Sequence, residues 1–350
     1  MHKLLVTGGA GFIGCNFVHY WMANNPNDKV VVLDKLTYAG NRENLAQVED
    51  NENFEFVQGD ICDQALVEKL LQNNRLDTIV HFAAESHVDR SITGPDIFIE
   101  TNVIGTHSLL KAARQVWLEE GLHKSDHRFH HVSTDEVYGS LGPNDPPFTE
   151  TTAYAPNSPY SASKAASDHL VRAYHETYGL NTTVSNCSNN YGPYQHPEKL
   201  IPLVILNILH GRPIPVYGDG KNVRDWLYVE DHCRGIEAVL KKGCVGEVYN
   251  IGGGNEVANI DLVERICGLV DEKFWGDDEL RERFLGAPAA KGKKSSSLIS
   301  YVDDRLGHDR RYAIDAGKVF EELGVEARFT VDEGLEVTFD WYLRNGVWFI

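Results

Sequence analysis

The segment between residues 3 and 34 constrains the fold of this chain most strongly. An apolar run passes into a glycine-rich turn, a helical pattern follows to about residue 24, and a second apolar run ends at Asp34. The glycines of the turn stand three residues apart, at Gly8, Gly11 and Gly14. Strand, glycine turn, helix and strand form the first unit of a doubly wound parallel sheet.

Glycine at these positions suits the binding of a dinucleotide. The bare backbone can approach a pyrophosphate at the helix N-terminus, where amide groups and the helix dipole favour negative charge. Asp34 follows Gly14 by twenty residues, and it can bind both ribose hydroxyls but would repel a 2'-phosphate. We therefore expect NAD rather than NADP. Asp60 and Ile61, after the third apolar run, are candidates to cap the adenine, although an ordinary helix N-terminal Asp is almost equally consistent with this pattern.

The alternation of apolar runs and helical patterns continues to about residue 190. Further strands are expected near residues 54–57, 78–82, 129–133 and 183–187, with helices near 64–73, 96–117 and 160–178 between them. Near-continuous apolar runs are typical of strands whose two faces are both covered. We predict an α/β fold with a doubly wound parallel (Rossmann) sheet.

Beyond Pro193 the elements become shorter and mixed. We predict that residues 1–190 form the NAD-binding domain and that residues 191–350 form mainly a smaller C-terminal α/β substrate domain. Segments such as 224–252 are expected to return to the first domain. Residues 276–297 are rich in Ala, Gly, Lys and Ser, which predicts a mobile surface excursion.

A second motif carries the chemistry, because the stretch 133–136 (Ser-Thr-Asp-Glu) precedes Tyr160 and Lys164. Residues four apart on a helix share one face, so the ammonium should favour the phenolate and lower the pKa of the tyrosine from about 10. Tyr160 is therefore the candidate base. Tyr217 and Lys221 have the same spacing, but the two glycines between them disfavour a helix.

Asp135 and Glu136 are carboxylic acids that a plain alcohol oxidation does not require. A second acid and base are needed when a C–H bond and a C–O bond of the same substrate are broken. The motif therefore indicates an elimination coupled to a redox step.

The formal net charge of −18 argues against a nucleic-acid partner, since non-specific nucleic-acid affinity comes from Lys and Arg. An anionic substrate must then meet a local basic cluster, for which the candidates are Lys199, Arg224, Arg305, Arg310 and Arg311. The first strand begins too early to leave room for a signal peptide, and no apolar stretch approaches the roughly 20 residues of a membrane span. We expect a cytoplasmic protein.

Cysteine and histidine do not point to a metal. The six cysteines are scattered without a C-x-x-C pair, which suits buried thiols in a reducing compartment. His130 and His131 lead to Thr134, but no cysteine or carboxylate stands at ligand spacing, so we favour strand histidines. We predict no metal site.

These motifs resemble the extended short-chain dehydrogenase/reductases, and within them the nucleotide-sugar 4,6-dehydratases. Thr-Asp-Glu ahead of Tyr-x-x-x-Lys is the most specific part of the resemblance, because related epimerases usually carry small hydroxyl residues there. The resemblance covers nearly the whole chain, through residues 7–14, 34–41, 83–91, 133–139, 160–164, 186–193, 224–226 and 304–315.

The resemblance implies that dTDP-glucose is oxidised at C4, loses water across C5 and C6 and is reduced at C6, giving dTDP-4-keto-6-deoxyglucose. Tyr160, supported by Lys164, would take the O4 proton. Glu136 would take the C5 proton, Asp135 would protonate the departing C6 hydroxyl, and Thr134 would hold O4.

The resemblance also implies the binding residues. Those for NAD are Gly8, Gly11, Phe12, Ile13, Gly14, Asp34, Lys35, Leu36, Thr37, Asp60, Ile61, Ala83, Ala84, Ser86, Thr101, Tyr160, Lys164 and Asn190. Those for the substrate are Ser86, Thr134, Asn189, Lys199, Leu200, Pro215, Val216, Tyr217, Arg224, Asn259, Asp304, Arg305, Leu306, Gly307 and His308. Leu306 departs from the family, which more often has proline there.

Three alternatives stay open from the sequence. Another nucleotide-sugar 4,6-dehydratase would differ in its base, a 4-epimerase would need only Tyr160, Lys164 and NAD, and a redox-sensing scaffold would keep the fold without the chemistry. The helices after Pro95 and from Tyr160 have wide apolar faces, which predicts a four-helix interface in a homodimer.

Overall fold

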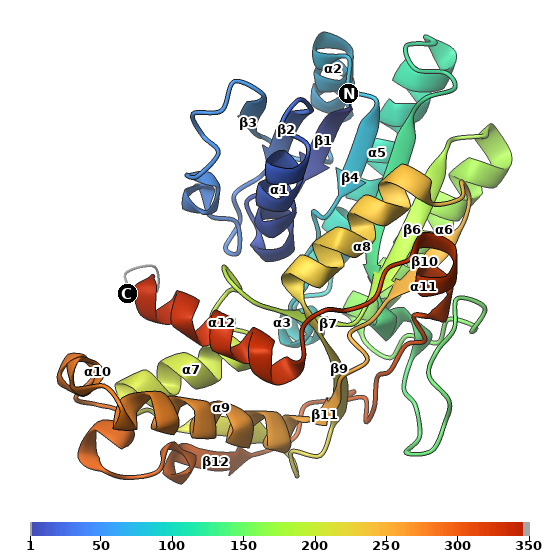
Figure 1. Ribbon diagram of the computed structural model, residues 1–350. Coiled ribbons are helices and arrows are strands. Elements are labelled where there is room, and N and C mark those ends of the chain that lie inside the picture. Colours follow the sequence, from blue (N-terminus) through green and yellow to red (C-terminus); the bar gives the residue numbers. More distant parts are fainter. Residues whose placement is uncertain (1, 346–350) are drawn as a thin grey trace.

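The computed structural model describes residues 2–345. Its largest sheet has seven strands, all paired in parallel, in the order β10-β6-β5-β4-β1-β2-β3 (Figure 1). The strands are β1 (Lys3–Thr7), β2 (Lys29–Asp34), β3 (Phe54–Gln58), β4 (Thr78–His81), β5 (Arg128–Thr134), β6 (Thr182–Cys187) and β10 (Val248–Ile251). The strand order reverses between β1 and β4, which is where ligands bind in open parallel sheets. The predicted doubly wound fold is confirmed.

Helices cover both faces of this sheet. On one face α1 (Phe12–Asn24) packs beside α8 (Val229–Lys242), and Phe17, Trp21 and Ile236 are fully buried against the strands. The other face is covered by α2 (Gln64–Asn74), α5 (Thr106–Ala113) and α6 (Pro159–Tyr178). Because both faces are buried, the strands can be apolar throughout, as the sequence predicted.

The helix expected over residues 96–117 is continuous but not uniform. It consists of α4 (Asp96–Phe98), the π-helical η2 (Ile99–Gly105), α5 and the π-helical η3 (Arg114–Glu119). Asn102 lies in η2, and its side chain bonds both the N–H and the C=O of Glu85 and the hydroxyl of Ser163. This amide ties the loop after β4 to α6, which positions the rim of the sheet.

The helix α6 begins where its sequence dictates. Ser158 and Ser161 form a capping box, with Pro159 at the first helical position, and Gly179 ends the helix in the left-handed conformation. Tyr160 and Lys164 therefore lie in the first two turns, beside the carboxyl end of β5.

A second group of elements forms its own apolar core below the large sheet (Figure 1). Ile205, Ile266 and Phe339 are buried in it. The elements are α7 (Leu200–His210), α9 (Asn259–Trp275), α12 (Val331–Arg344), the sheet β11 (Glu256–Ala258), β9 (Val223–Tyr228), β7 (Asn189–Tyr191) and the pair β12 (Ile299–Val302), β8 (Ile214–Tyr217). The domain boundary near residue 190 stays a prediction.

The segment 276–297 is more ordered than its composition suggested. It contains α10 (Asp278–Arg283), η5 (Ala289–Lys291) and the start of η6 (Ser295–Leu298). Buried Asp271 accepts hydrogen bonds from the N–H and hydroxyl of Ser295, and Ala287 is fully buried. The segment lies mostly at the surface, as predicted, but regular elements anchor it on α9. Its mobility stays a prediction. The remaining elements are η1 (Arg42–Leu45), α3 (Val88–Thr93), η4 (Asp135–Tyr138) and α11 (Gly317–Leu323). No helix among residues 2–345 is long and apolar enough to cross a membrane.

Candidate active site

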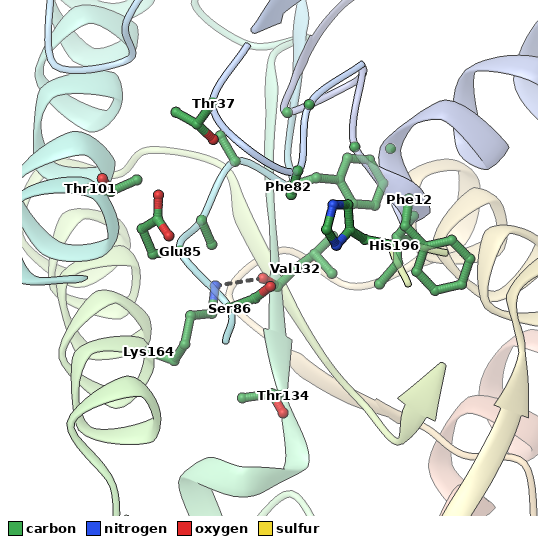
Figure 2. A pocket seen from close by; sticks show the side chains of 18 of the residues that line it. Phe12, Thr37, Phe82, Glu85, Ser86, Thr101, Val132, Thr134, Lys164 and His196 are labelled. Atoms are coloured by element: carbon green, nitrogen blue, oxygen red, sulfur yellow. Dashed lines mark hydrogen bonds between the residues drawn. The ribbon is translucent and has the colours of Figure 1, made fainter. Parts of the chain in front are cut away.

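A cleft follows the carboxyl edge of the large sheet (Figure 2). Its walls come from the glycine turn after β1 and the loops after β2, β3, β4, β5 and β6, together with α6 and the segment before α7. Every residue predicted for NAD lines this cleft except Leu36. The parallel topology brings these distant segments together, because it places all carboxyl ends on one edge.

The glycine turn leaves no room for side chains. A Cβ on Gly8 would lie 2.6 Å from the backbone nitrogen of Ala83, and Gly8 has a φ of +70°. A Cβ on Gly14 would lie 2.2 Å from the carbonyl oxygen of Gly8. The turn is thus a bare-backbone cradle at the start of α1, which fits a pyrophosphate.

The carboxylate of Asp34 is oriented by two backbone N–H groups in a position that suits a ribose. It accepts hydrogen bonds from the N–H groups of Ala10 at 2.9 Å and Leu36 at 2.8 Å. Leu36 therefore acts through its backbone, since it orients Asp34 without lining the cleft. Burial raises the pKa of Asp34, and the two N–H groups oppose that shift. Asp60 lines the cleft and pairs with Lys35 at 2.7 Å. Cradle and carboxylate together fit NAD.

The catalytic candidates meet at the end of β5. Thr134 caps η4, accepting a hydrogen bond from the N–H of Glu136 at 3.3 Å and donating one to the Asp135 carboxylate at 3.3 Å. Asp135, Glu136, Tyr160 and Lys164 all line the same cleft. Figure 2 shows the side chains of Thr134 and Lys164 among those that line the cleft.

The two adjacent carboxyl groups sit in different environments. Burial raises the pKa of Asp135 well above its usual range, and the neighbouring Glu136 raises it further. Burial also raises the pKa of Glu136, but Arg224, Arg305 and Lys199 oppose that shift. Asp135 thus holds its proton more strongly than Glu136, which is the better base.

The expected lowering of the Tyr160 pKa is wrong for this arrangement. Burial raises the pKa of Tyr160 well above 10, Glu136 raises it further, and a hydrogen bond from Thr134 opposes the shift only in part. The Lys164 ammonium donates to the carbonyl of Val132 at 2.8 Å (Figure 2). The four-residue spacing placed Tyr160 and Lys164 on one helix face. It could not predict the hydrogen bond from Lys164 to Val132 on β5.

Three of the five predicted basic residues surround Glu136, on which Lys199, Arg224 and Arg305 all act electrostatically. Lys199 donates to the carbonyl of Ser86 at 2.9 Å and Arg224 to the carbonyl of Asp309 at 2.9 Å.

Arg310 and Arg311 are not part of this group. They form ion pairs with Asp219 at 2.8 Å and Glu256 at 2.6 Å, respectively. Their inclusion in the basic cluster is wrong, because carboxylates distant in sequence already compensate their charges.

The predicted substrate residues fall into two groups. Ser86, Thr134, Asn189 and Lys199 line the cleft. The second group lies outside its lining and comprises Leu200, Pro215, Val216, Tyr217, Arg224, Asn259, Asp304, Arg305, Leu306, Gly307 and His308.

Part of this second group is assembled by the strand pair β8 and β12. Tyr217 ends β8 opposite Val302, and the ring of His308 meets the Tyr217 ring edge-on at 6.3 Å. His308 also pairs with Asp304 at 2.6 Å, while Leu306 is exposed.

Sequence reasoning missed several residues that line the cleft. They are Leu33, Ala39, Gly40, Gly59, Phe82, Glu85, Ile97, Val132, Ser133, Cys187, Ser188, Gln195, His196 and Glu198. Cys187 ends a predicted strand and Ser188 follows it, and this position at a carboxyl end could have indicated both residues. His196 and Glu198 gave no such signal, because the chain before α7 is brought to the cleft only by tertiary packing.

The comparisons with known proteins agree over nearly the full length. The family model described as GDP-mannose 4,6 dehydratase matches residues 5–338. A dTDP-glucose 4,6-dehydratase of Xanthomonas campestris is 58% identical over 349 residues, which cover 99% of this chain and 95% of the relative. One from Escherichia coli K12 is 55% identical, with 99% and 94% covered.

Solved structures give the same result. A dTDP-glucose 4,6-dehydratase from Streptomyces venezuelae with NAD and dTDP bound has a TM-score of 0.86 at 48% identity, covering 99% of this chain and 98% of that one. A UDP-glucose 4-epimerase from Thermotoga maritima is also similar, with a TM-score of 0.81 at 29% identity and 98% and 99% covered.

Proposed function

Because the chain belongs to the GDP-mannose 4,6-dehydratase family, we propose that it is an NAD-dependent hydro-lyase that converts dTDP-glucose to dTDP-4-keto-6-deoxyglucose and water. One observation carries this proposal: Asp135 and Glu136 share the cleft with Tyr160 and Lys164. A 4-epimerase eliminates no water, so its reaction would not need the two carboxyl groups.

Binding of the two ligands follows from the two ends of the site. The glycine cradle and Asp34 would hold NAD, and Ala83, Ala84 and Thr101 would line its path along the cleft. NAD held there would supply a hydride acceptor for C4 and a hydride donor for C6, and its positive charge would favour the phenolate of Tyr160. Lys199, Arg224 and Arg305 would bind the diphosphate of the sugar nucleotide.

The chain's own groups move the protons. Tyr160 takes the O4 proton while Thr134 holds O4, and the ketone formed at C4 acidifies C5. Glu136 takes the C5 proton, and Asp135 gives its proton to the C6 oxygen, which leaves as water. Glu136 then returns its proton to C5. The proton gained by Tyr160 equals the one lost by Asp135, so a transfer between them completes the cycle.

The raised pKa of Asp135 suits this division of labour, since an acid must hold its proton until the C–O bond breaks. The basic residues near Glu136 keep it more readily ionised. Two neighbouring groups of the same type can thus act as acid and base at one pH.

We also propose a cytoplasmic homodimer. Ile99 and Ile104 on η2 and Tyr178 on α6 are large apolar side chains that are 48%, 52% and 42% exposed. A second copy would cover them with the same surface. The six cysteines are free, which supports a reducing compartment.

The test of function is turnover of dTDP-glucose that carries deuterium at C4. We expect a product lighter by one water, with the deuterium at C6, as measured by mass spectrometry and NMR. A galactose-type product that keeps its C6 oxygen and carries deuterium at C4 would instead establish the epimerase. Parallel assays with UDP-, CDP- and GDP-glucose would determine the base preference.

A further inference from the structure

Asp168 is a buried carboxylate for which the proposed reaction has no use. It lies on α6, one turn beyond Lys164, and only 4% of its surface is exposed. Its Oδ2 accepts hydrogen bonds from the hydroxyl of Ser133 at 2.8 Å and that of Tyr154 at 3.0 Å. An isolated buried charge is strongly unfavourable, so a carboxylate here requires a compensating charge.

The other oxygen of Asp168 faces Lys164 across the imidazole of His131. Asp168 Oδ1 lies 3.2 Å from His131 Nε2, and the same nitrogen lies 3.4 Å from Lys164 Nζ. His131 is on the central strand β5 and is fully buried. One nitrogen of a neutral imidazole cannot bond both groups, so Lys164 and Asp168 lie on either side of His131 and act on each other through their charges.

The charges of these three groups can be assigned. Burial and the Lys164 ammonium lower the pKa of His131 well below its usual value, so the imidazole is neutral. Burial raises the pKa of Asp168 to about 6, and Lys164 opposes that shift. Burial lowers the pKa of Lys164, and Asp168 opposes this most strongly. At neutral pH the charged partners are therefore Lys164 and Asp168.

We infer that Asp168 is a positioning residue for Lys164, whose buried ammonium it compensates across His131 and thereby keeps charged in the lining of the cleft. The inference rests on the proposed function, in which Lys164 supports Tyr160. The hydrogen bond from Ser133 adds a second effect, because Ser133 directly precedes Thr134 and Asp135. One carboxylate thus fixes both the lysine on α6 and the end of β5.

Other titratable groups face this pair from the neighbouring elements. They are His131 on β5, His81 on β4, Cys187 on β6, Tyr138 on η4, Tyr154 before α6 and His169 on α6. Burial keeps the imidazoles of His81 and His131, the Cys187 thiol and the tyrosine hydroxyls uncharged at neutral pH. His169, like Lys164, opposes the rise in the pKa of Asp168. Among the described groups that support the charge of Lys164, Asp168 is the strongest.

The first test is Asp168→Asn, which keeps the shape and an acceptor for Ser133 and Tyr154. The charge of Asp168 raises the pKa of Lys164, so its removal should lower that pKa. We expect the alkaline limb of the kcat–pH profile to move to lower pH by about one unit, which is a tenfold change in proton affinity.

Tyr154→Phe is the matched control, since Tyr154 lies outside the lining of the cleft. It removes one hydrogen bond to Asp168 but leaves the charge. We expect a lower Tm with an unchanged alkaline limb. If Asp168→Asn likewise lowers only the Tm, Asp168 is merely structural and the inference is overturned.

A direct measurement does not depend on turnover. The pKa of Lys164 can be followed by NMR in the full-length protein with lysine labelled at Cε, with Lys164→Met assigning the signal. Reciprocally, Lys164→Met should raise the pKa of Asp168 above about 6, as seen by carboxyl-carbon NMR. If the pKa of Asp168 stays at about 6 in Lys164→Met, the inference is overturned, even when Asp168→Asn fails to fold. A wild-type protein that is inactive on dTDP-glucose but shows both shifts would refute the proposed function alone.

Discussion

At the scale of single residues, the site depends on two neighbouring carboxyl groups that differ only in surroundings. Asp135 is 1% exposed and interacts with Thr134 and Glu136, whereas Glu136 is half-buried and faces Lys199, Arg224 and Arg305. Because like charges repel and burial disfavours ionisation, Asp135 holds its proton more strongly than Glu136 does. The order of the residues along the chain does not determine these roles; the three cations do.

Glu136→Gln should block the reaction after its first step. Glutamine fills the same space but cannot take the C5 proton, so we expect turnover to fall by about 10²–10⁴-fold, the usual contribution of a general base. Oxidation at C4 does not need Glu136, so absorbance of the reduced nicotinamide should build up on mixing with dTDP-glucose. Stopped-flow absorbance and product NMR measure the two effects.

The same change at exposed Glu52 is the control, and it should leave both measurements at wild-type values. If Glu136→Gln shows neither product nor reduced cofactor, Glu136 acts before or during the oxidation, and the assignment of the C5 base to it is wrong.

Asp135→Asn should abolish the elimination step and raise the thermal stability of the protein. The folded-state pKa of Asp135 is raised, so the carboxyl destabilises the fold once the pH exceeds its unfolded pKa of about 4, increasingly up to the folded value. Asparagine removes this penalty. We expect lost elimination and, at pH 8, a Tm higher by roughly 1 °C or more, because about 1 kcal/mol shifts the Tm of a 350-residue chain by roughly 1–2 °C.

Thermal unfolding at pH 4 provides the comparison for this variant. There the carboxyl is protonated in the folded state and about half protonated in the unfolded state, so most of the Tm difference from wild type should disappear. An equal difference at both pH values would mean that the substitution acts through packing or hydrogen bonding rather than through the charge of Asp135.

At the scale of elements, the junctions between strands and helices carry the function. The turn from β1 into α1 supplies bare backbone, the cap of η4 presents Asp135 and Glu136, and the first turns of α6 present Tyr160 and Lys164. Each junction is encoded locally by glycine, Thr134 or the Ser158–Ser161 capping box. Neighbouring parallel strands then bring the junctions to one edge.

Gly14→Ala should destroy the cradle. The new Cβ would lie 2.2 Å from the carbonyl oxygen of Gly8 and 2.8 Å from the Cα of Gly9, and this backbone cannot give way without opening the turn. We expect destabilisation of at least about 1–3 kcal/mol, typical of overpacking, with weaker NAD binding. Chemical denaturation and calorimetric titration with NAD measure the two effects.

Gly268→Ala is the matched control within a helix. Gly268 lies inside α9, and a Cβ there meets nothing within 4 Å. Alanine should therefore stabilise the protein by about 0.5–1 kcal/mol and leave NAD binding unchanged. Wild-type stability and NAD affinity in Gly14→Ala would contradict the assignment of the turn to the pyrophosphate.

At the scale of the whole molecule, the site is made by two cores. The NAD side of the cleft belongs to the large sheet, whereas Lys199 precedes α7, and Arg224 and Arg305 belong to or border the elements of the second core. A charge of −18 is thus compatible with an anionic substrate, because tertiary packing gathers these cations around Glu136.

The proposed dimer gives a prediction at this scale. Ile104→Asp places a charge in the apolar surface of η2, where Ile104 is 52% exposed, so a dimer that uses this surface should dissociate. Sedimentation velocity should show a shift from dimer to monomer. Leu285→Asp, on a residue that is 70% exposed beyond α10, is the control and should leave the mass unchanged. A monomeric wild type would exclude the dimer.

The sequence by itself determined most of the fold and the chemical class of the site. Strands β1 to β6 and helices α1, α2 and α6 lie within a residue or two of where periodicity, capping and glycine placed them, because these signals act locally. The pairing of Tyr160 with Lys164 and the adjacency of Asp135 and Glu136 are likewise properties of short segments.

Tertiary structure decided whatever depends on contacts between distant segments. It gave Asp135 and Glu136 different proton affinities, bonded Lys164 to Val132, and paired Arg310 and Arg311 with distant carboxylates. It also packed residues 276–297 against α9 and brought His196 and Glu198 to the cleft. Burial and charge compensation depend on neighbours in space, and those exist only once the chain has folded.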